Sequence, residues 1–213
     1  MTERATSLRE RNKLRTRQAI SDVATRLFLR RGFDRVTIAD VAAAAGVAKM
    51  TVTNHFPRKE DLVFDIHEDL VASLAGAVSA RGPGDSALAA LRRHSLDGLR
   101  DHHPALGFSG QPFGAMIAGS PPLRARLREI HEHQEDALAA VLAAETGAGP
   151  DDLAPRIAAA QLAAVVRVLA TEVMARTRDG QDAGVIAHDL TVSAHRAFGL
   201  LEPALDGYAV RAA

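Results

Sequence analysis

The sequence predicts an all-α protein, and two observations lead to that fold class. Apolar residues recur at helical spacing through most of the 213 residues, and no segment alternates apolar and polar residues as a half-buried strand does. Capping residues, glycines and prolines separate the periodic segments where helices should begin and end. We expect helices over residues 7–31, 37–45, 49–55, 59–80, 86–100, 121–145, 152–178 and 185–201, with a broken, partly helical segment over 102–119.

The first helix is expected to open at a capping box, Ser7 to Glu10, after a mobile arm of residues 1–6. Gly32 should end this helix, because glycine readily adopts the positive φ of a helix terminus. Its buried stripe has the spacing of one helix face and consists of Ile20, Val23, Ala24, Leu27 and Phe28. The stripe predicts that this helix packs against the next two.

Two short helices follow and meet at Gly46. Thr37 and Asp40 form a capping box at the start of the first, and Gly46 supplies the turn between them. On the second helix, Val52 and Phe56 face inward. The side chains left outward are Lys49, Met50, Thr51, Thr53, Asn54 and His55. Two short helices joined by a glycine turn, the second carrying outward polar groups, are typical of a DNA-reading helix-turn-helix.

Residues from about 14 to 70 resemble the DNA-binding domain of the tetracycline-repressor (TetR) family of transcriptional regulators. The residues that match in order and spacing are Ala24, Leu27, Phe28, Gly32, Phe33, Thr37, Ile38, Ala39, Ala45, Gly46, Val47, Thr51, Phe56, Lys59 and Glu60. Ala48 departs from the pattern, since a serine commonly caps the second helix there. Met50, Thr53 and His55 replace a frequent glycine and two frequent tyrosines. These departures leave the fold unchanged but obscure the operator sequence.

The resemblance implies a three-helix DNA-binding domain over residues 1–58 and a helical ligand-binding and dimerisation domain over residues 59–213. It implies a ligand-responsive repressor that binds a palindromic operator on double-stranded DNA as a homodimer. The alternative is an all-helical small-molecule carrier or enzyme that keeps a vestigial DNA-binding head. The retained polar face of the second short helix favours the regulator. No catalytic motif is present, so we expect no enzymatic activity.

The charge distribution also separates the two parts. Residues 1–60 contain thirteen Lys/Arg and six Asp/Glu, a net charge of +7, and the neutral whole chain therefore leaves −7 on the rest. A basic N-terminal part beside a helix-turn-helix favours a DNA partner. Four basic residues of the first helix are expected near the phosphate backbone: Arg11, Lys13, Arg15 and Arg17.

Within the helix-turn-helix we expect two kinds of DNA contact. Lys49, Thr53 and Asn54 should approach base edges, because asparagine pairs with adenine in a bidentate way and lysine donates to guanine. Met50 lies on the same outward face. The expected phosphate contacts are Thr37, Thr51, His55 and Lys59.

In the C-terminal part, the resemblance implies that the helices over 152–178 and 185–201 form a dimer interface and that the middle helices enclose an effector cavity. The side chains expected to line it are Phe108, Phe113 and Met116 as apolar groups and His94, His102 and Arg167 as polar anchors. A salt bridge or a stem extended to solvent is the other interpretation of Arg167. Together these groups favour a mostly apolar effector with one acceptor or acidic group.

Metal, cofactor and membrane partners are not expected. Cysteine is absent, and His131 and His133 are two residues apart, which places them on different helix faces. No apolar run approaches the roughly 20 residues that span a bilayer, and the N-terminus is charged. The cytoplasm is therefore the expected location.

Overall fold

The computed structural model describes residues 8–212, which form nine α-helices and two short 3-10 helices. The helices are α1 (Leu8–Arg31), α2 (Ile38–Ala45), α3 (Lys49–His55), η1 (Glu60–Leu62), α4 (His67–Ser79), α5 (Ala87–Arg100), η2 (Pro104–Leu106), α6 (Gln111–Gly119), α7 (Pro121–Thr146), α8 (Ala154–Arg178) and α9 (Ala183–Leu205). Strand pairing among these residues is limited to one bridge, Ser86 to Val210. The all-α prediction is confirmed. The expected arm and the Ser7 cap lie outside the described residues.

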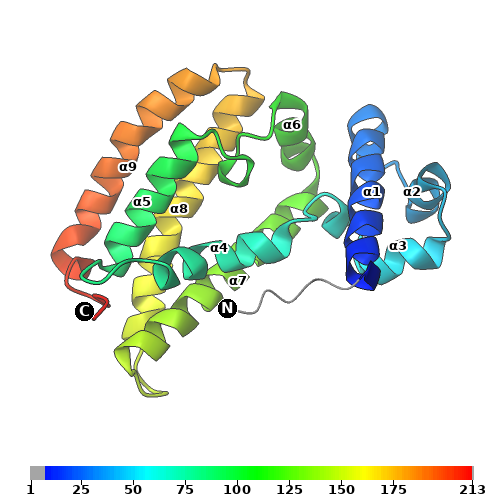
Figure 1. Cartoon of the computed structure of the whole chain (residues 1–213). Coiled ribbons are helices and arrows are strands. Elements are labelled where there is room, and N and C mark those ends of the chain that lie inside the picture. Colours follow the sequence, from blue (N-terminus) through cyan, green and yellow to red (C-terminus); the bar gives the residue numbers. More distant parts are fainter. Residues whose placement is uncertain (1–7, 213) are drawn as a thin grey trace.

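Helices α1 to α3 form a head at one end of the molecule, and α4 to α9 form the body (Figure 1). The predicted capping box is present, because Thr37 Oγ1 accepts the Asp40 N–H at 3.1 Å and Asp40 Oδ2 accepts the Thr37 N–H at 2.8 Å. Gly46 ends α2 with a φ of 67°. The buried apolar residues of the head include Ile20, Ala24, Phe28, Phe33, Val36, Val41, Val52 and Phe56.

The prediction of one continuous helix over residues 59–80 is wrong. Helix η1 ends at Leu62, the chain crosses residues 63–66 without forming a helix, and α4 begins at His67. Four successive residues, Asp61 to Phe64, are buried. An amphipathic helix buries one face only, so a continuous helix could not bury all four. The segment at residues 63–66 is therefore an irregular connection between head and body.

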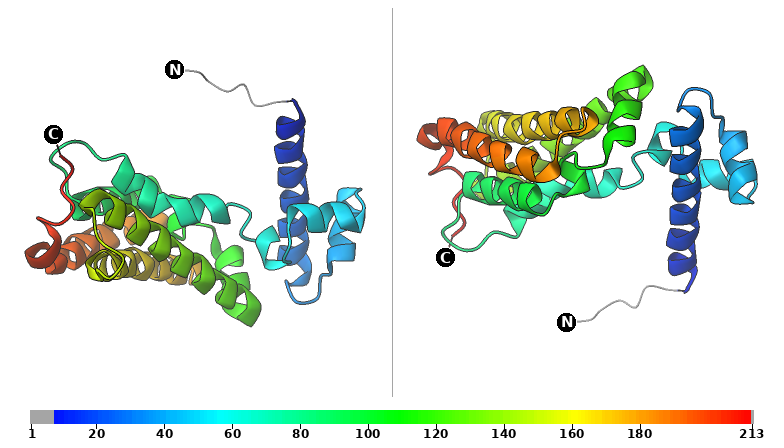
Figure 2. Two further views of the ribbon diagram at one scale, coloured as in Figure 1. Left: turned by 90° about the horizontal axis from the view of Figure 1, so that it is seen from below. Right: turned by 90° about the horizontal axis from the view of Figure 1, so that it is seen from above.

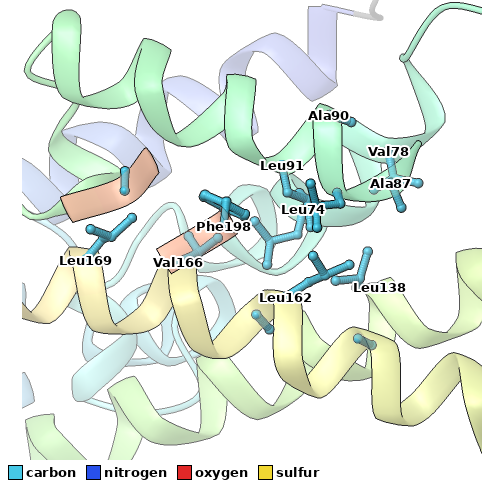
Figure 3. Packing of buried hydrophobic residues seen from close by; sticks show 14 of the residues in the cluster. Leu74, Val78, Ala87, Ala90, Leu91, Leu138, Leu162, Val166, Leu169 and Phe198 are labelled. Atoms are coloured by element: carbon cyan, nitrogen blue, oxygen red, sulfur yellow. The ribbon is translucent and has the colours of Figure 1, made fainter. Parts of the chain in front are cut away.

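In the body, α4, α5, α7, α8 and α9 enclose the larger apolar core (Figure 3). Leu74, Leu91, Leu138, Leu162 and Phe198 each come from a different one of these helices and are fully buried. Figures 1 and 2 show α8 running beside α7 on one side and α9 on the other. The predicted helices of this part are confirmed to within a few residues at each end, and the broken segment resolves into η2 and α6.

A second apolar cluster joins head and body. It contains the head core and extends to Ile117 of α6 and to Leu123 and Ile130 of α7. The two parts therefore share buried surface, and a shift of α6 or α7 would displace the side chains of the head that pack against them.

Helix α8 departs from the expectation that no apolar segment could span a bilayer. Its length and composition, with a mean hydropathy of 1.6, are sufficient to cross a membrane. Residues of α8 such as Leu162, Val166 and Val173 are buried in the body core. Only 39% of the apolar window is buried, so packing in the core accounts for part of this composition.

Candidate DNA-binding surface and adjoining cavity

Helix α3 is fixed to the head through two buried side chains, Val52 and Phe56. Ala48 occupies the N-cap position with φ −71° and ψ 148°, and no side chain accepts a hydrogen bond from the first turn. The absence of a capping side chain follows from the alanine that the sequence places there. Helix α3 is therefore held by packing and not by a cap.

The remaining side chains of α3 form an outward polar face. Lys49, Met50 and Asn54 are exposed, while Thr51 and Thr53 are half-buried. The Thr53 hydroxyl donates to the Met50 carbonyl at 3.1 Å, which leaves its oxygen able to accept a hydrogen bond. The Asn54 amide has no hydrogen-bond partner among residues 8–212. This face carries both donors and acceptors, as base edges in a major groove require.

His55 closes this face at the end of α3, where it is half-buried. Burial, followed by the positive charges of Lys13 and Arg17, lowers the pKa of its imidazole below the ordinary value. Its Nδ1 is buried and lacks a hydrogen-bond partner in the part of the chain that the structure describes. The neutral ring is therefore favoured, and a phosphate would favour the protonated form.

Thr37 and Lys59, both expected at phosphates, are already engaged within the protein. The Thr37 hydroxyl donates to Asp40 Oδ2 at 2.6 Å. Lys59 Nζ donates to the Phe33 carbonyl at 2.6 Å and lies 4.2 Å from the centroid of the Phe33 ring. Burial lowers the pKa of the Lys59 ammonium, and the charges of Asp34 and Glu60 oppose that shift. Lys59 thus stabilises the junction of α1 with η1, and two of its three N–H donors remain for another group.

Arg17 is likewise bonded to other parts of the protein. Its Nη1 donates to the His55 carbonyl at 2.6 Å and its Nη2 donates to the Asp65 carbonyl at 2.9 Å, while the guanidinium lies 4.3 Å from the centroid of the Phe56 ring. It therefore ties α1 to the end of α3 and to the connection at residues 63–66. Three basic residues of the same helix are exposed: Arg11, Lys13 and Arg15.

A cavity of about 830 Å³ lies where head and body meet. The head contributes one face of α1, and the connection at residues 63–66 contributes a second wall. The remaining walls come from α4, the loop around η2, α6, α7 and α8. The side chains of α1 that line it are Ser21, Asp22, Thr25 and Arg26, and those of α7 are Arg124, Leu127, Ile130, His131 and Gln134.

The loop after η2 can approach α8 closely because of Gly107. Gly107 has a φ of 109°, and a Cβ atom there would lie 2.8 Å from the Ala170 carbonyl oxygen. A larger residue would force this loop away from α8. The close approach brings Phe108 to the cavity wall.

Three of the six residues predicted for the effector site line this cavity: Phe108, Phe113 and Arg167. His102 is exposed, with its ring 5.0 Å from the Phe108 ring. Met116 lines a second, smaller cavity of about 490 Å³ between the end of α1 and α6. His94 lies on α5 and lines neither cavity, and burial is the main cause that lowers its pKa.

Sequence reasoning missed the contribution of α7. His131 lines the cavity, whereas His133 is exposed on another face of the helix. Gln134 also lines it and donates through Nε2 to the Leu70 carbonyl at 2.9 Å and to Ser73 Oγ at 2.8 Å. In the sequence, this wall is indicated only by the helical spacing of Leu127, Ile130 and Gln134. Ordinary core packing produces the same spacing.

An ion-pair cluster joins Arg58 and η1 to α7. Arg126 Nε and Nη2 both lie 2.9 Å from Asp61 Oδ1, and the Arg126 and Asp61 side chains are 11% and 5% exposed. Arg126 Nη1 donates to Glu129 at 2.9 Å, and Arg58 Nη1 donates to the same carboxylate at 2.5 Å. The residues after α3 are thus bonded to the helix that carries His131.

The family model described as "Bacterial regulatory proteins, tetR family" matches residues 20–66. The HTH-type transcriptional regulator TcmR of Streptomyces glaucescens is 30% identical over 178 residues, which span 80% of this chain and 78% of that protein.

Two solved structures share the fold. The crystal structure of NalD, the secondary repressor of the MexAB-OprM multidrug efflux pump in Pseudomonas aeruginosa, is 20% identical with a TM-score of 0.52, covering 88% of this chain and 97% of that one. The SmeT–triclosan complex is 21% identical with a TM-score of 0.52, covering 84% and 91%.

Proposed function

Because the chain belongs to the tetracycline-repressor family of bacterial transcriptional regulators, we propose that it is a ligand-responsive repressor that binds a palindromic operator as a homodimer in the cytoplasm. In this proposal residues 1–58 bind DNA and residues 59–213 bind the effector and the second copy. The observation that carries it is the exposed polar face of α3 on a head that also forms one wall of the cavity.

The polar face of α3 reads the operator in this proposal. Lys49, Thr53 and Asn54 approach base edges, and Met50 makes apolar contact beside them. Thr51, His55, Thr37 and Lys59 hold the phosphate backbone, with the last two using groups left over from their internal bonds. Arg11, Lys13 and Arg15 add exposed positive charge on α1.

Helices α8 and α9 supply the dimer interface in this proposal. Large apolar side chains remain exposed on both: Ile157 at 55% and Val168 at 59% on α8, and Val185 at 48%, Val192 at 46% and Leu200 at 82% on α9. Burying such a surface against its own copy removes apolar area from water. A two-fold axis through these helices sets the two copies of α3 about 34–36 Å apart, one turn of DNA.

The cavity provides the switch. An effector bound there contacts α1 of the head and the connection at residues 63–66 directly, and α7 carries the ion pair to Asp61. Effector binding thereby disfavours any arrangement of the head that fits the effector less well. The effector then weakens DNA binding by the same factor by which DNA weakens effector binding.

Selection of genomic DNA fragments by the purified protein tests this function. We expect enrichment of an inverted repeat with half-sites one helical turn apart and a dimer by light scattering. A monomer that recovers a single asymmetric half-site would contradict the proposal.

Two variants assign the role of α3 in the same experiment. Asn54→Ala should lose discrimination at one base pair in each half-site, at a cost of about 1–3 kcal/mol. Gln181→Ala, which removes an exposed amide from the body, should select the same repeat as the wild type. Equal losses on operator and random DNA for Asn54→Ala would exclude it as a base-reading residue.

A further inference from the structure

The cavity carries an excess of positive side chains. Four arginines line it, Arg26, Arg124, Arg167 and Arg178, against two aspartates, Asp22 and Asp65. The aspartates are engaged: Asp65 Oδ2 accepts from Ser21 Oγ at 2.6 Å, and Asp22 Oδ1 accepts from Gln18 Nε2 at 2.9 Å. A negatively charged group entering this space meets a favourable field.

Arg26 on α1 and Arg167 on α8 are the two exposed arginines of this set that have no protein partner among residues 8–212, and Arg167 is the one that stands on a helix packed against α7. Arg124 donates to the Ala118 carbonyl at 2.5 Å and Arg178 donates to Asp179 at 2.8 Å. The Arg167 guanidinium makes no hydrogen bond or ion pair within residues 8–212. An arginine offers five donors in a planar fork, so Arg167 presents an open site for a carboxylate.

His131 lies beside Arg167 on the neighbouring helix. Both side chains line the same cavity from two helices that pack together, and burial, followed by the positive charge of Arg167, lowers the pKa of the His131 imidazole. A neutral imidazole can donate one hydrogen bond, and a neighbouring anion favours its charged form. Arg167 and His131 are therefore two donors on the adjoining α8 and α7 walls of the cavity.

The rest of the lining is apolar. Phe108, Phe113 and Ile117 come from the η2 loop and α6, Leu127 from α7 and Met174 from α8. A cavity of about 830 Å³ falls within the range that holds small molecules of drug size.

From this geometry we infer that the cavity binds an apolar molecule with a single carboxylate, which Arg167 holds in a bidentate way and to which His131 donates a further hydrogen bond. This inference rests on the proposed effector role of the cavity and names the chemical class of its ligand. Hydrogen bonds to charged groups are stronger than neutral ones, so the acid is preferred over its alcohol and amine analogues.

Calorimetric titration of the full-length protein with decanoate, decan-1-ol and decylamine tests the inference. We expect decanoate to bind about tenfold or more tightly than either analogue. Arg167→Gln should weaken decanoate by about tenfold and change decan-1-ol by less than about twofold. Arg167→Lys, which keeps the charge but lacks the planar fork of donors, should bind decanoate with an affinity between those of the wild type and Arg167→Gln. Arg128→Gln, an exposed arginine of α7 outside the cavity, is the matched control and should bind like the wild type.

The outcomes separate the ligand class from the effector role. If decan-1-ol or decylamine binds at least as tightly as decanoate and releases operator DNA, the carboxylate class is overturned while the regulator stands. If none of the three binds a protein that still binds its operator, both the class and the effector role of this cavity are overturned. An Arg167→Gln variant that keeps the preference for decanoate would overturn the anchor.

Discussion

The guanidinium of Arg126 on α7 donates to the buried carboxylate of Asp61, with Nε and Nη2 each 2.9 Å from Oδ1. Asp61 lies in η1, the next helix after α3 along the chain, and Arg126 lies one residue before the cavity-lining Leu127. Asp61 Oδ2 also accepts the Arg58 N–H at 3.2 Å. The pair therefore bonds η1, which directly precedes the connection at residues 63–66, to a helix that forms a wall of the cavity.

Removal of one partner of this pair should destabilise the protein. Arg126→Met leaves the Asp61 carboxylate buried without its cation, and we expect a loss of about 3–5 kcal/mol in the free energy of unfolding. The double variant Asp61→Asn with Arg126→Met should lose less than the sum of the single variants. Urea denaturation measures all three, and Arg128→Met on the solvent side of α7 should stay within about 0.5 kcal/mol of the wild type. Additive losses would show that the two residues act independently.

Lys59 and Lys49 should differ in what their removal changes. Lys59→Met removes an ammonium from the Phe33 carbonyl and ring, and we expect the free energy of unfolding to fall by about 1–2 kcal/mol. Lys49 is exposed on α3 and is proposed to contact a base edge, so Lys49→Met should leave stability unchanged and relax discrimination at one base pair of each half-site. Because the remaining donors of Lys59 are proposed to bind a phosphate, Lys59→Met should also lower the salt slope of operator binding by about one unit, and an unchanged slope would contradict that contact.

The uncapped start of α3 offers a stabilising change. Ala48 already has the extended φ and ψ of an N-cap residue, so a serine there can accept a hydrogen bond without strain. We expect Ala48→Ser to raise the free energy of unfolding by about 0.5–2 kcal/mol. Ala44→Ser, at an exposed position inside α2, should lower it by about 0.5 kcal/mol. Thermal unfolding of both variants checks the difference, and a destabilised Ala48→Ser would show that packing excludes the hydroxyl.

Local signals explain which parts of the fold the sequence predicted. The capping box at Thr37, the turn at Gly46 and the inward positions of Val52 and Phe56 depend on neighbouring residues, and all are present. The break after Leu62 depends on tertiary contacts, because Asp61 is buried by Arg126, which lies 65 residues away. Periodicity in residues 59–80 alone could not report that contact.

The lining of the cavity also depends on tertiary contacts that sequence periodicity does not report. Phe108 and Phe113 stand in a segment whose glycines and prolines mark irregular structure, and both line the cavity. Met116 lies in the same segment but lines the smaller cavity. His94 lies on α5 and lines neither cavity. His131 and Gln134 lie on a regular helix whose pattern fits core packing, so their place in the wall follows only from the meeting of α7 with α8 and the head. Arg167, unusual within an apolar helix, was detectable by its charge.

Two half-buried histidines should make stability depend on pH. Burial is the main cause that lowers the pKa of His94 and of His131, with His103 and Arg167 adding to it respectively, and Asp97 opposes the shift at His94. Below pH of about 6.5 the unfolded chain therefore binds more protons than the folded one, and the free energy of unfolding falls as pH decreases. The free energy of unfolding stops falling once the pH lies below the pKa values that these histidines have in the folded protein.

Urea denaturation at pH values between about 7.5 and 5 measures this dependence. His94→Gln combined with His131→Gln should make it shallower, and His55, whose pKa is also lowered by burial, accounts for part of the slope that remains. His133→Gln, which changes an exposed histidine of α7, should keep the wild-type curve. An unchanged slope in the double variant would place the titrating groups elsewhere.

We propose that the cavity and the head are thermodynamically coupled, and one calorimetric comparison tests this coupling most directly. Decanoate is titrated into the free protein and into the protein saturated with its selected operator. We predict an affinity about 5–150-fold weaker in the presence of operator, because the coupling must be reciprocal. Equal decanoate affinities with and without operator would contradict the coupling and would make the body a ligand carrier that happens to be joined to a DNA-binding head.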